Sequence, residues 1–237
     1  MEEWWKRLQS AGNLSLIAMA DVEIVEEKNP RNFTHFVSVD LFPDENLNHE
    51  GCTSGDALPC ITPVQEYQAM LEDVRGIGSP MQRNKMHITM AILTVPEGAL
   101  QEVKDGITSA MLEFRDALAR EAFFVGMSGL EMFSTPCNEK HLVSEVKIGR
   151  HALALLRSAL FERLGDYISD KSWRPHVTIF KRSQLSEEDE GRVITACHGI
   201  SFGVYKLSSV TLRLRKKRDA SEPNELREGL RFSLKEL

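Results

Sequence analysis

The sequence predicts an α+β protein with two pseudo-symmetric lobes of largely antiparallel sheet, helices on the outside and a central cleft. Two observations lead to this prediction. Two short apolar segments rich in β-branched residues, 86–93 and 175–180, share a closely similar tetrapeptide and indicate one buried strand in each lobe. Helix-like segments with a single apolar stripe accompany each of them. We expect one bilobal domain over residues 33–237.

The chain begins with a leader, residues 1–32, whose structure is left open: Trp4, Trp5 and Leu8 suit one short helix, and the period of the apolar stretch Leu14–Val25 is ambiguous. Residues 33–42 alternate between apolar and polar side chains, which is typical of a strand. A polar loop follows at 43–63, long enough to be functional or disordered. Apolar residues spaced three and four apart then predict a helix over 64–74. A Gly- and Pro-containing break leads into the first apolar strand.

The second half of the chain repeats the same two kinds of pattern. An apolar stripe recurs at helical spacing in two segments, and shorter apolar runs indicate strands. The predicted elements, in order, are a helix at 103–118, strands at 123–133 and 141–148, a helix at 153–164, the strand 175–180, a helix that begins within 186–190, and closing strands within 200–215 and 230–234.

The two apolar strands carry the same short motif. His87-Ile88-Thr89 recurs as His176-Val177-Thr178, in a chain with only seven histidines. A basic residue stands two positions before each motif, Lys85 in the first and Arg174 in the second. Two chance copies within matching apolar runs are improbable, so the repeat indicates a shared role.

Strand geometry predicts which of these side chains lie together. Side chains alternate between the two faces of a strand, so residues two apart share a face. The residues expected to face the cleft are Lys85, His87 and Thr89 on one strand and Arg174, His176, Thr178 and Phe180 on the other. The opposite faces carry Met86, Ile88, Met90, Ile92 and Val177, Ile179. Lys181 follows Phe180 and is expected to point away from the cleft.

This set of side chains suits chemistry at phosphorus. A neutral imidazole takes a proton and an imidazolium gives one near neutral pH, so His87 and His176 would act as a general acid–base pair. The hydroxyls of Thr89 and Thr178 would donate to phosphate oxygens. The alternatives are histidines that only support the core and threonines that only form strand. No metal or cofactor is required for this division of labour, and we predict none.

Composition limits the class of protein. The net charge of −6 argues against a protein that coats long nucleic acids, although a short oligoribonucleotide or nucleotide substrate fits a locally positive cleft. No apolar run reaches the length of a membrane span, and the acidic start predicts no signal peptide. The four cysteines form no Cys-x-x-Cys pair, which argues against a zinc site. We expect a monomer in the cytoplasm or nucleus; the basic run 213–218 is either a solvated face or a nuclear-import or RNA-contacting patch.

Four segments together resemble a known family, the two-histidine (2H) phosphoesterases. They are the opening strand Phe36–Val39, the motif His87–Thr89, the strand-to-helix stretch Leu142–Leu156 and the motif Pro175–Thr178. A pair of His-x-Thr/Ser motifs in pseudo-symmetric lobes defines that family. Within it, the chain is most similar to the 2′,5′-RNA-ligase-like branch, represented by the central domain of the A-kinase anchoring proteins. The resemblance covers roughly residues 33–215.

The resemblance implies a metal-independent phosphodiesterase that cleaves short RNA-like substrates, with 2′,5′-linked oligoadenylate as the first candidate. It implies catalytic roles for His87, Thr89, His176 and Thr178. It also aligns Phe36 with a position that can stack on a base. Together with Phe36, the expected substrate contacts are Lys85, Arg174 and Phe180.

Two departures from the family pattern limit the prediction. The C-terminal residues 221–237 lack a long apolar stripe, so kinase anchoring is not predicted. The polar loop 43–63 leaves substrate choice at its edge open. The alternatives are a 2′,3′-cyclic phosphodiesterase, an enzyme that processes RNA 3′ ends, or a module that binds AMP or a related nucleotide without turnover. The branch that trims RNA 3′ ends typically has His-x-Ser, whereas both motifs here carry Thr.

Overall fold

The computed structural model describes residues 34–41, 63–82, 85–117, 123–135, 138–170, 173–207, 209–214 and 229–233. The predicted leader 1–32 and nearly all of the predicted loop 43–63 lie outside the described residues. The helices are α2 (Pro63–Leu71), α3 (Leu100–Ala117), α4 (Arg150–Leu164), the 3-10 helix η4 (Gly165–Tyr167) and α5 (Glu187–Ala196). The strands are β1 (His35–Asp40), β2 (Ser79–Pro80), β3 (His87–Leu93), β4 (Phe123–Ser134), β5 (Lys140–Ile148), β6 (His176–Lys181), β7 (Ser201–Leu207), β8 (Ser209–Leu214) and β9 (Leu230–Ser233).

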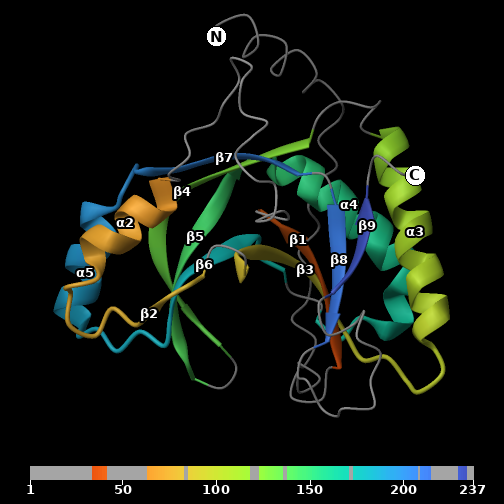
Figure 1. Ribbon diagram of the computed structural model, residues 1–237, viewed down its shortest axis with the longest axis horizontal. Helices are drawn as coiled ribbons and strands as arrows, with labels where there is room; N and C mark the ends of the chain where they lie inside the picture. Colours follow the sequence, from red (N-terminus) through yellow and green to blue (C-terminus); the bar gives the residue numbers. More distant parts are fainter. Residues whose placement is uncertain are drawn as a thin grey trace, which may run out of the picture.

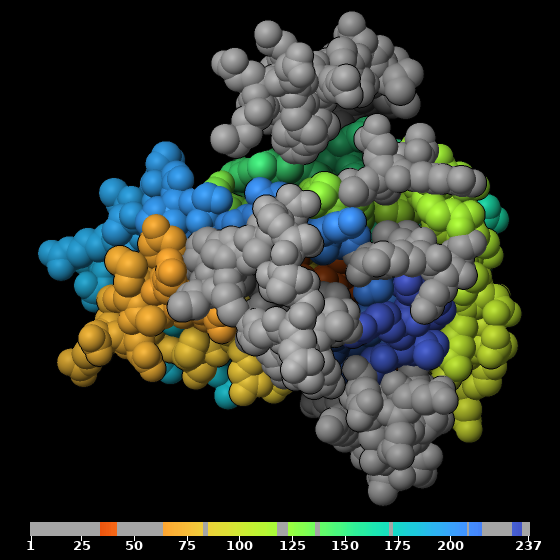
Figure 2. All heavy atoms as spheres, turned by 45° about the horizontal axis from the view of Figure 1, so that its top comes forward, coloured from red at the N-terminus to blue at the C-terminus, as the bar shows by residue number. Residues whose placement is uncertain are grey.

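The described strands form one nine-stranded sheet in the order β7-β4-β5-β6-β3-β1-β8-β9, with β2 paired to β6. Every pairing within it is antiparallel. The sheet is strongly curled, with α2 and α5 outside one end and α3 and α4 outside the other (Figure 1). The space-filling view also places the orange α2 and the pale blue α5 at the opposite end from the yellow-green α3 (Figure 2). The predicted α+β class with two antiparallel lobes is confirmed.

The helices form where their apolar stripes meet the sheet. In α3 the buried residues are Val103, Ile107, Ala110, Met111 and Phe114, spaced as the sequence predicts. In α4 the leucines that recur at helical spacing, Leu153, Leu156, Leu160 and Leu164, are all buried. Helix α5 begins after Ser186, whose side chain accepts a hydrogen bond from the backbone N–H of Asp189 at 3.2 Å, so the predicted start of this helix is confirmed.

The closing segment 200–215 is divided between the two lobes. Strand β7 pairs with β4 at one edge of the sheet, whereas β8 pairs with β1 in the other lobe. Only residue 208 separates the two strands in sequence. The prediction of strands in this segment is confirmed, but the pattern of apolar residues does not reveal that the chain crosses between lobes here.

The two motif strands each contain a β-bulge at the same position. On β3, Thr89 pairs with Ser38 and Ala91 pairs with Val37, so Met90 is the extra residue. On β6, Thr178 pairs with Val143 and Phe180 pairs with Leu142, so Ile179 is the extra residue. Met90 and Ile179 each stand three residues after the motif histidine. A bulge reverses the alternation of side chains beyond it, so the predicted core-facing position of Ile92 is wrong: it is only partly buried, and its strand partner is Phe36, whose ring contacts His87.

Candidate active site

The two motifs meet at the centre of the sheet. Ile88 pairs with Val177 across the antiparallel junction of β3 and β6, and both side chains are fully buried. The same register, continued by one residue in each direction, puts His87 opposite Thr178 and Thr89 opposite His176. All four of these side chains are partly exposed. The predicted convergence of two histidines and two threonines therefore follows from the pairing of the strands.

Both imidazoles are held in the same way. Nδ1 of His87 lies 2.7 Å from the backbone oxygen of Lys85, and Nδ1 of His176 lies 2.8 Å from that of Arg174. A carbonyl oxygen only accepts hydrogen bonds, so Nδ1 carries the proton in each ring. In the neutral form this leaves the lone pair on Nε2, the nitrogen that faces away from the backbone contact. Each histidine can then exchange a proton through Nε2.

Burial lowers the pKa of both histidines. For His87 the hydrogen bond to the Lys85 carbonyl and the charge of Asp40 oppose this effect, while the charges of Arg213 and Lys181 add to it. For His176 the hydrogen bond to the Arg174 carbonyl opposes it, and the charges of Arg174 and His141 add to it. The balance of these effects leaves the pKa of each imidazole below the ordinary histidine value, so both rings favour the neutral form at neutral pH in the absence of an anion.

An aromatic ring lies against each imidazole. The ring of Phe36 on β1 has its centroid 5.4 Å from that of His87, with 32° between the planes. The ring of Phe133 on β4 stacks on His176 at 4.5 Å and 30°. Phe36 was predicted as a site residue, and the structure places it beside the histidine. Phe133 lies two strands away from β6, so no local sequence pattern connects it to the second motif.

The predicted placement of Phe180 is wrong. Its side chain is fully buried in the core, because the bulge at Ile179 turns it away from the face that carries His176. The same bulge brings Lys181 onto that face, where its charge is close enough to lower the pKa of His87. Strict alternation predicts that Lys181 points away from the site. This prediction is wrong because the bulge cannot be recognised from the sequence alone.

A buried carboxylate lies opposite each histidine on the neighbouring outer strand. Asp40 pairs with His87, and Glu145 pairs with His176. Asp40 accepts hydrogen bonds from Thr211 Oγ1 and Arg213 Nη2, both at 2.8 Å. Because these partners lie on β8, far away in sequence, the sequence pattern gives no indication of them.

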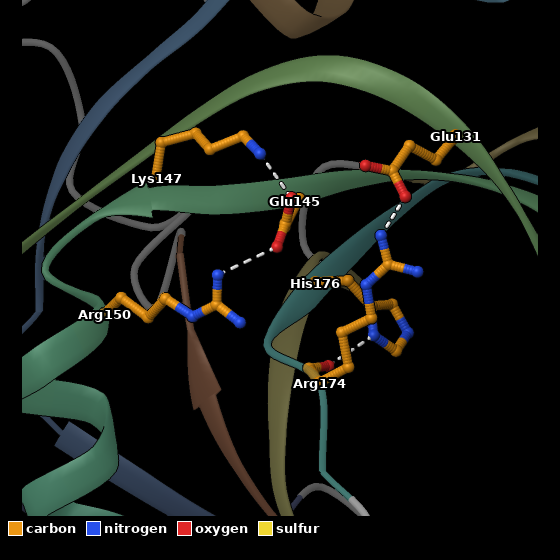
Figure 3. A network of polar contacts seen from close by, with 6 residues as sticks. All are labelled: Glu131, Glu145, Lys147, Arg150, Arg174 and His176. Carbon is orange, nitrogen blue, oxygen red and sulfur yellow. Dashed lines mark hydrogen bonds and ion pairs between the residues drawn. The ribbon is translucent and has the colours of Figure 1, made fainter. Parts of the chain in front are cut away.

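The second carboxylate holds two cations at the edge of the site. Glu145 forms ion pairs with Lys147 and with Arg150, the latter at 3.0 Å (Figure 3). The predicted site residue Arg174 forms an ion pair with Glu131, and its side chain runs beside the ring of His176 (Figure 3). The cation of Arg174 is therefore close to the second motif, as expected, but it already has an anionic partner.

Lys85, the matching residue of the first motif, is exposed. Burial lowers the pKa of Lys181, and the positive charge of Lys85 lowers it further. In the described part of the chain, no three His, Cys, Asp or Glu side chains gather in a way that could hold a metal ion. No helix among the described residues is long and apolar enough to cross a membrane.

Comparison with known proteins places this chain in a family. Residues 60–224 match the family model described as the AKAP7 2'5' RNA ligase-like domain. Similar solved structures include Escherichia coli LigT complexed with 3'-AMP, at 13% identity over 77% of this chain and 87% of that chain, with a TM-score of 0.49. Usb1 of Kluyveromyces marxianus is similar at 12% identity, over 77% and 94% of the two chains, with a TM-score of 0.46.

A third similar structure is the MHV ns2 PDE domain, at 16% identity over 74% of this chain and 97% of that chain, with a TM-score of 0.44. No curated protein matches the chain. The family match covers both motifs and the strands and helices between them.

Proposed function

We propose that this chain, which belongs to the AKAP7 2'5' RNA ligase-like domain family and is a two-histidine phosphodiesterase, cleaves short RNA-like substrates, with 2′,5′-linked oligoadenylate as the first candidate. The observation that carries the proposal is the matched state of the two imidazoles. Each donates from Nδ1 to a backbone carbonyl and presents Nε2, and each stands opposite a threonine of the other motif. This arrangement supports proton transfer at two sides of one phosphate.

In the proposed reaction the substrate phosphate lies between the two imidazoles. One Nε2 accepts the proton of the attacking hydroxyl, from a neighbouring ribose or from water, as the new P–O bond forms. The protonated Nε2 of the other histidine gives its proton to the leaving oxygen as the old P–O bond breaks. The hydroxyls of Thr89 and Thr178 donate to the non-bridging oxygens, and the ammonium of Lys181 offsets their charge.

The surroundings of the imidazoles support an RNA-like substrate. Phe36 and Phe133 put one aromatic ring beside each histidine, where a base on either side of the phosphate could stack. Two carboxylates and their cationic partners supply further polar groups at the edges. From the sequence we also propose that the protein works as a monomer in the cytoplasm or nucleus.

The test is a panel of three substrates: 2′,5′-oligoadenylate, 3′,5′-oligoadenylate and adenosine 2′,3′-cyclic phosphate. We expect the 2′,5′-linked substrate to be cleaved fastest, with no loss of rate in excess chelator, and the rate to fall by about 10²–10⁴-fold in His87→Ala and in His176→Ala. His151→Ala is the matched control, because His151 is exposed on α4. Faster cleavage of the cyclic substrate would favour the cyclic phosphodiesterase. Tight binding of AMP without cleavage of any substrate would favour a binding module.

A further inference from the structure

The two motif strands separate soon after they meet, and each is then covered by the segment that leads into the other motif. On β3, Leu93 forms a bridge with Ile168, and the backbone oxygen of Ile92 accepts from the N–H of Ser169 at 2.8 Å. The N–H of Ile92 donates to Asp170 Oδ1 at 3.0 Å. Residues 168–170 stand six to eight positions before His176, so the approach to the second motif holds the strand of the first.

The same arrangement recurs on β6. Strand β2 pairs Ser79 with Lys181 and Pro80 with Phe180, and the N–H of Met81 donates to the oxygen of Ile179 at 2.8 Å. These residues stand six to eight positions before His87. The approach to the first motif therefore holds the strand of the second, and the two catalytic strands are tied to one another twice.

A buried side chain from a helix completes each tie at the bulge. Arg157 of α4 donates to the backbone oxygen of Met90 and, at 3.0 Å, to that of Asp170. Gln68 of α2 donates to the backbone oxygens of Ile179 and Met81, at 2.9 and 3.0 Å. In each lobe one side chain thus binds the carbonyl of the bulge and a carbonyl of the covering segment. Both side chains are buried, so water does not compete for these contacts.

A third contact reaches the catalytic threonine of the first motif. Nε1 of Trp173, three residues before His176, donates to the backbone oxygen of Thr89 at 2.8 Å. The guanidinium of Arg157 lies 5.7 Å from the centre of the Trp173 ring, and its Nη2 lies 3.7 Å from Asp170 Oδ2. Arg157 and Trp173 therefore hold neighbouring carbonyls of the first motif strand from the segment that delivers the second histidine.

We propose that Arg157 and Trp173 are positioning residues that fix the separation between His87 and His176. The proposal rests on the proposed function, because it needs both imidazoles to reach one phosphate. A misplacement of about 1 Å costs on the order of a hundredfold in rate when two groups must act together. Arg157 spans two carbonyls with a planar fork, and a lysine ammonium does not reproduce this geometry.

The first test is steady-state kinetics of Arg157→Lys and Trp173→Phe on 2′,5′-linked oligoadenylate. We expect kcat to fall roughly tenfold or more while KM stays within about twofold, because substrate contacts remain and only the alignment of acid and base is lost. Arg163→Lys is the matched control on the same helix, since Arg163 is half-exposed and pairs with Glu113. If one of the two variants does not fold, the kcat of the other still tests the proposal. A kcat within about twofold of wild type in the folded variants overturns the proposal.

The second test does not depend on turnover. Inorganic phosphate is titrated into protein labelled with ¹⁵N-histidine, and the Nε2 signals of the two motif histidines are followed. In wild type we expect both signals to move with one dissociation constant, because one phosphate contacts both rings. In the variants we expect the signals to move with different constants. If both signals still move with one dissociation constant in the variants, or if they do not do so in wild type, the positioning role is overturned. If the titrations behave as expected but wild type does not cleave the substrate, only the proposed function is contradicted.

Discussion

Ile88 and Val177 pair at the junction of the two lobes, and the histidines and threonines of the two motifs are related across this pair. Each residue is the centre of its motif, so the pairing sets His87 opposite Thr178 and His176 opposite Thr89. The bulges, the Nδ1 hydrogen bonds and the carboxylates opposite each histidine repeat on both sides. The site therefore has two-fold pseudo-symmetry, and the charges around the two histidines are what distinguish them.

Lys181 and its neighbour Phe180 are predicted to behave in opposite ways. Lys181→Met is expected to lower kcat/KM about tenfold and to change the free energy of unfolding by less than about 0.5 kcal/mol, because Lys181 is exposed on the site face. Phe180→Ala is expected to destabilise the fold by about 3–5 kcal/mol, because its ring is fully buried. Kinetics and urea denaturation measure the two effects. Lys206→Met, at an exposed position on β7, is the control; equal kcat/KM in Lys181→Met and this control would rule out the role of Lys181.

Asp40→Asn is predicted to lower the pKa of His87 further. The negative charge of Asp40 is one of the effects that favour the imidazolium of His87. The substitution also removes the anionic partner of Arg213, so the free energy of unfolding is expected to fall by about 3–5 kcal/mol. NMR titration of the histidine signals measures the pKa, with His176 as the internal control. An unchanged His87 titration in the folded variant would show that the charge of Asp40 does not act on it.

Arg174→Gln is predicted to raise the pKa of His176, whereas Asp40→Asn is predicted to lower that of His87. The charge of Arg174 lowers the pKa of His176, whereas the hydrogen bond to its backbone carbonyl persists in the variant. The pKa of His176 is therefore expected to rise towards its ordinary value of 6.5. The same NMR titration detects the change, and the signal of His87 should not move. A fall in the pKa of His176 would contradict this assignment of charges.

The two motif histidines are predicted to make the fold less stable in mild acid. Their pKa values are lower in the folded protein than in the unfolded chain. Between the folded value and about 6.5 the unfolded chain binds more protons, so the free energy of unfolding falls as pH drops through that window. Above 6.5 the contribution is fully present. Urea denaturation at pH 7.5 and pH 5.5 measures the loss, which should be smaller in His87→Asn and His176→Asn than in wild type. An equal loss of unfolding free energy in all three proteins would contradict a contribution from these histidines.

The central residues of the site could be predicted from the sequence because their pattern is local. The repeat around His87 and His176 and the alternation of side chains within three residues place the two histidines and two threonines on one face. The helices α3 and α4 follow from their apolar spacing for the same reason. Each of these inferences uses only neighbouring residues.

The remaining site residues depend on pairings between distant segments. The bulge at Ile179 exchanges the expected positions of Phe180 and Lys181, and it is stabilised by Gln68, 111 residues away in sequence. Asp40 and Phe133 reach the histidines only through the order of strands in the sheet. Because these positions are set by tertiary pairing, no period or motif in the sequence marks them.

The pH dependence of kcat/KM for a 2′,5′-linked adenylate dimer, in wild type and in the two single variants His87→Ala and His176→Ala, tests most directly whether the two imidazoles work as an acid–base pair. Wild type is predicted to give a bell-shaped profile with its maximum below pH 6.5, because both pKa values are lowered in the free enzyme. Each variant is predicted to lose about 10²–10⁴-fold in rate and to keep one limb of the bell. A wild-type profile without two limbs, or a variant that retains the wild-type rate, would contradict the paired mechanism.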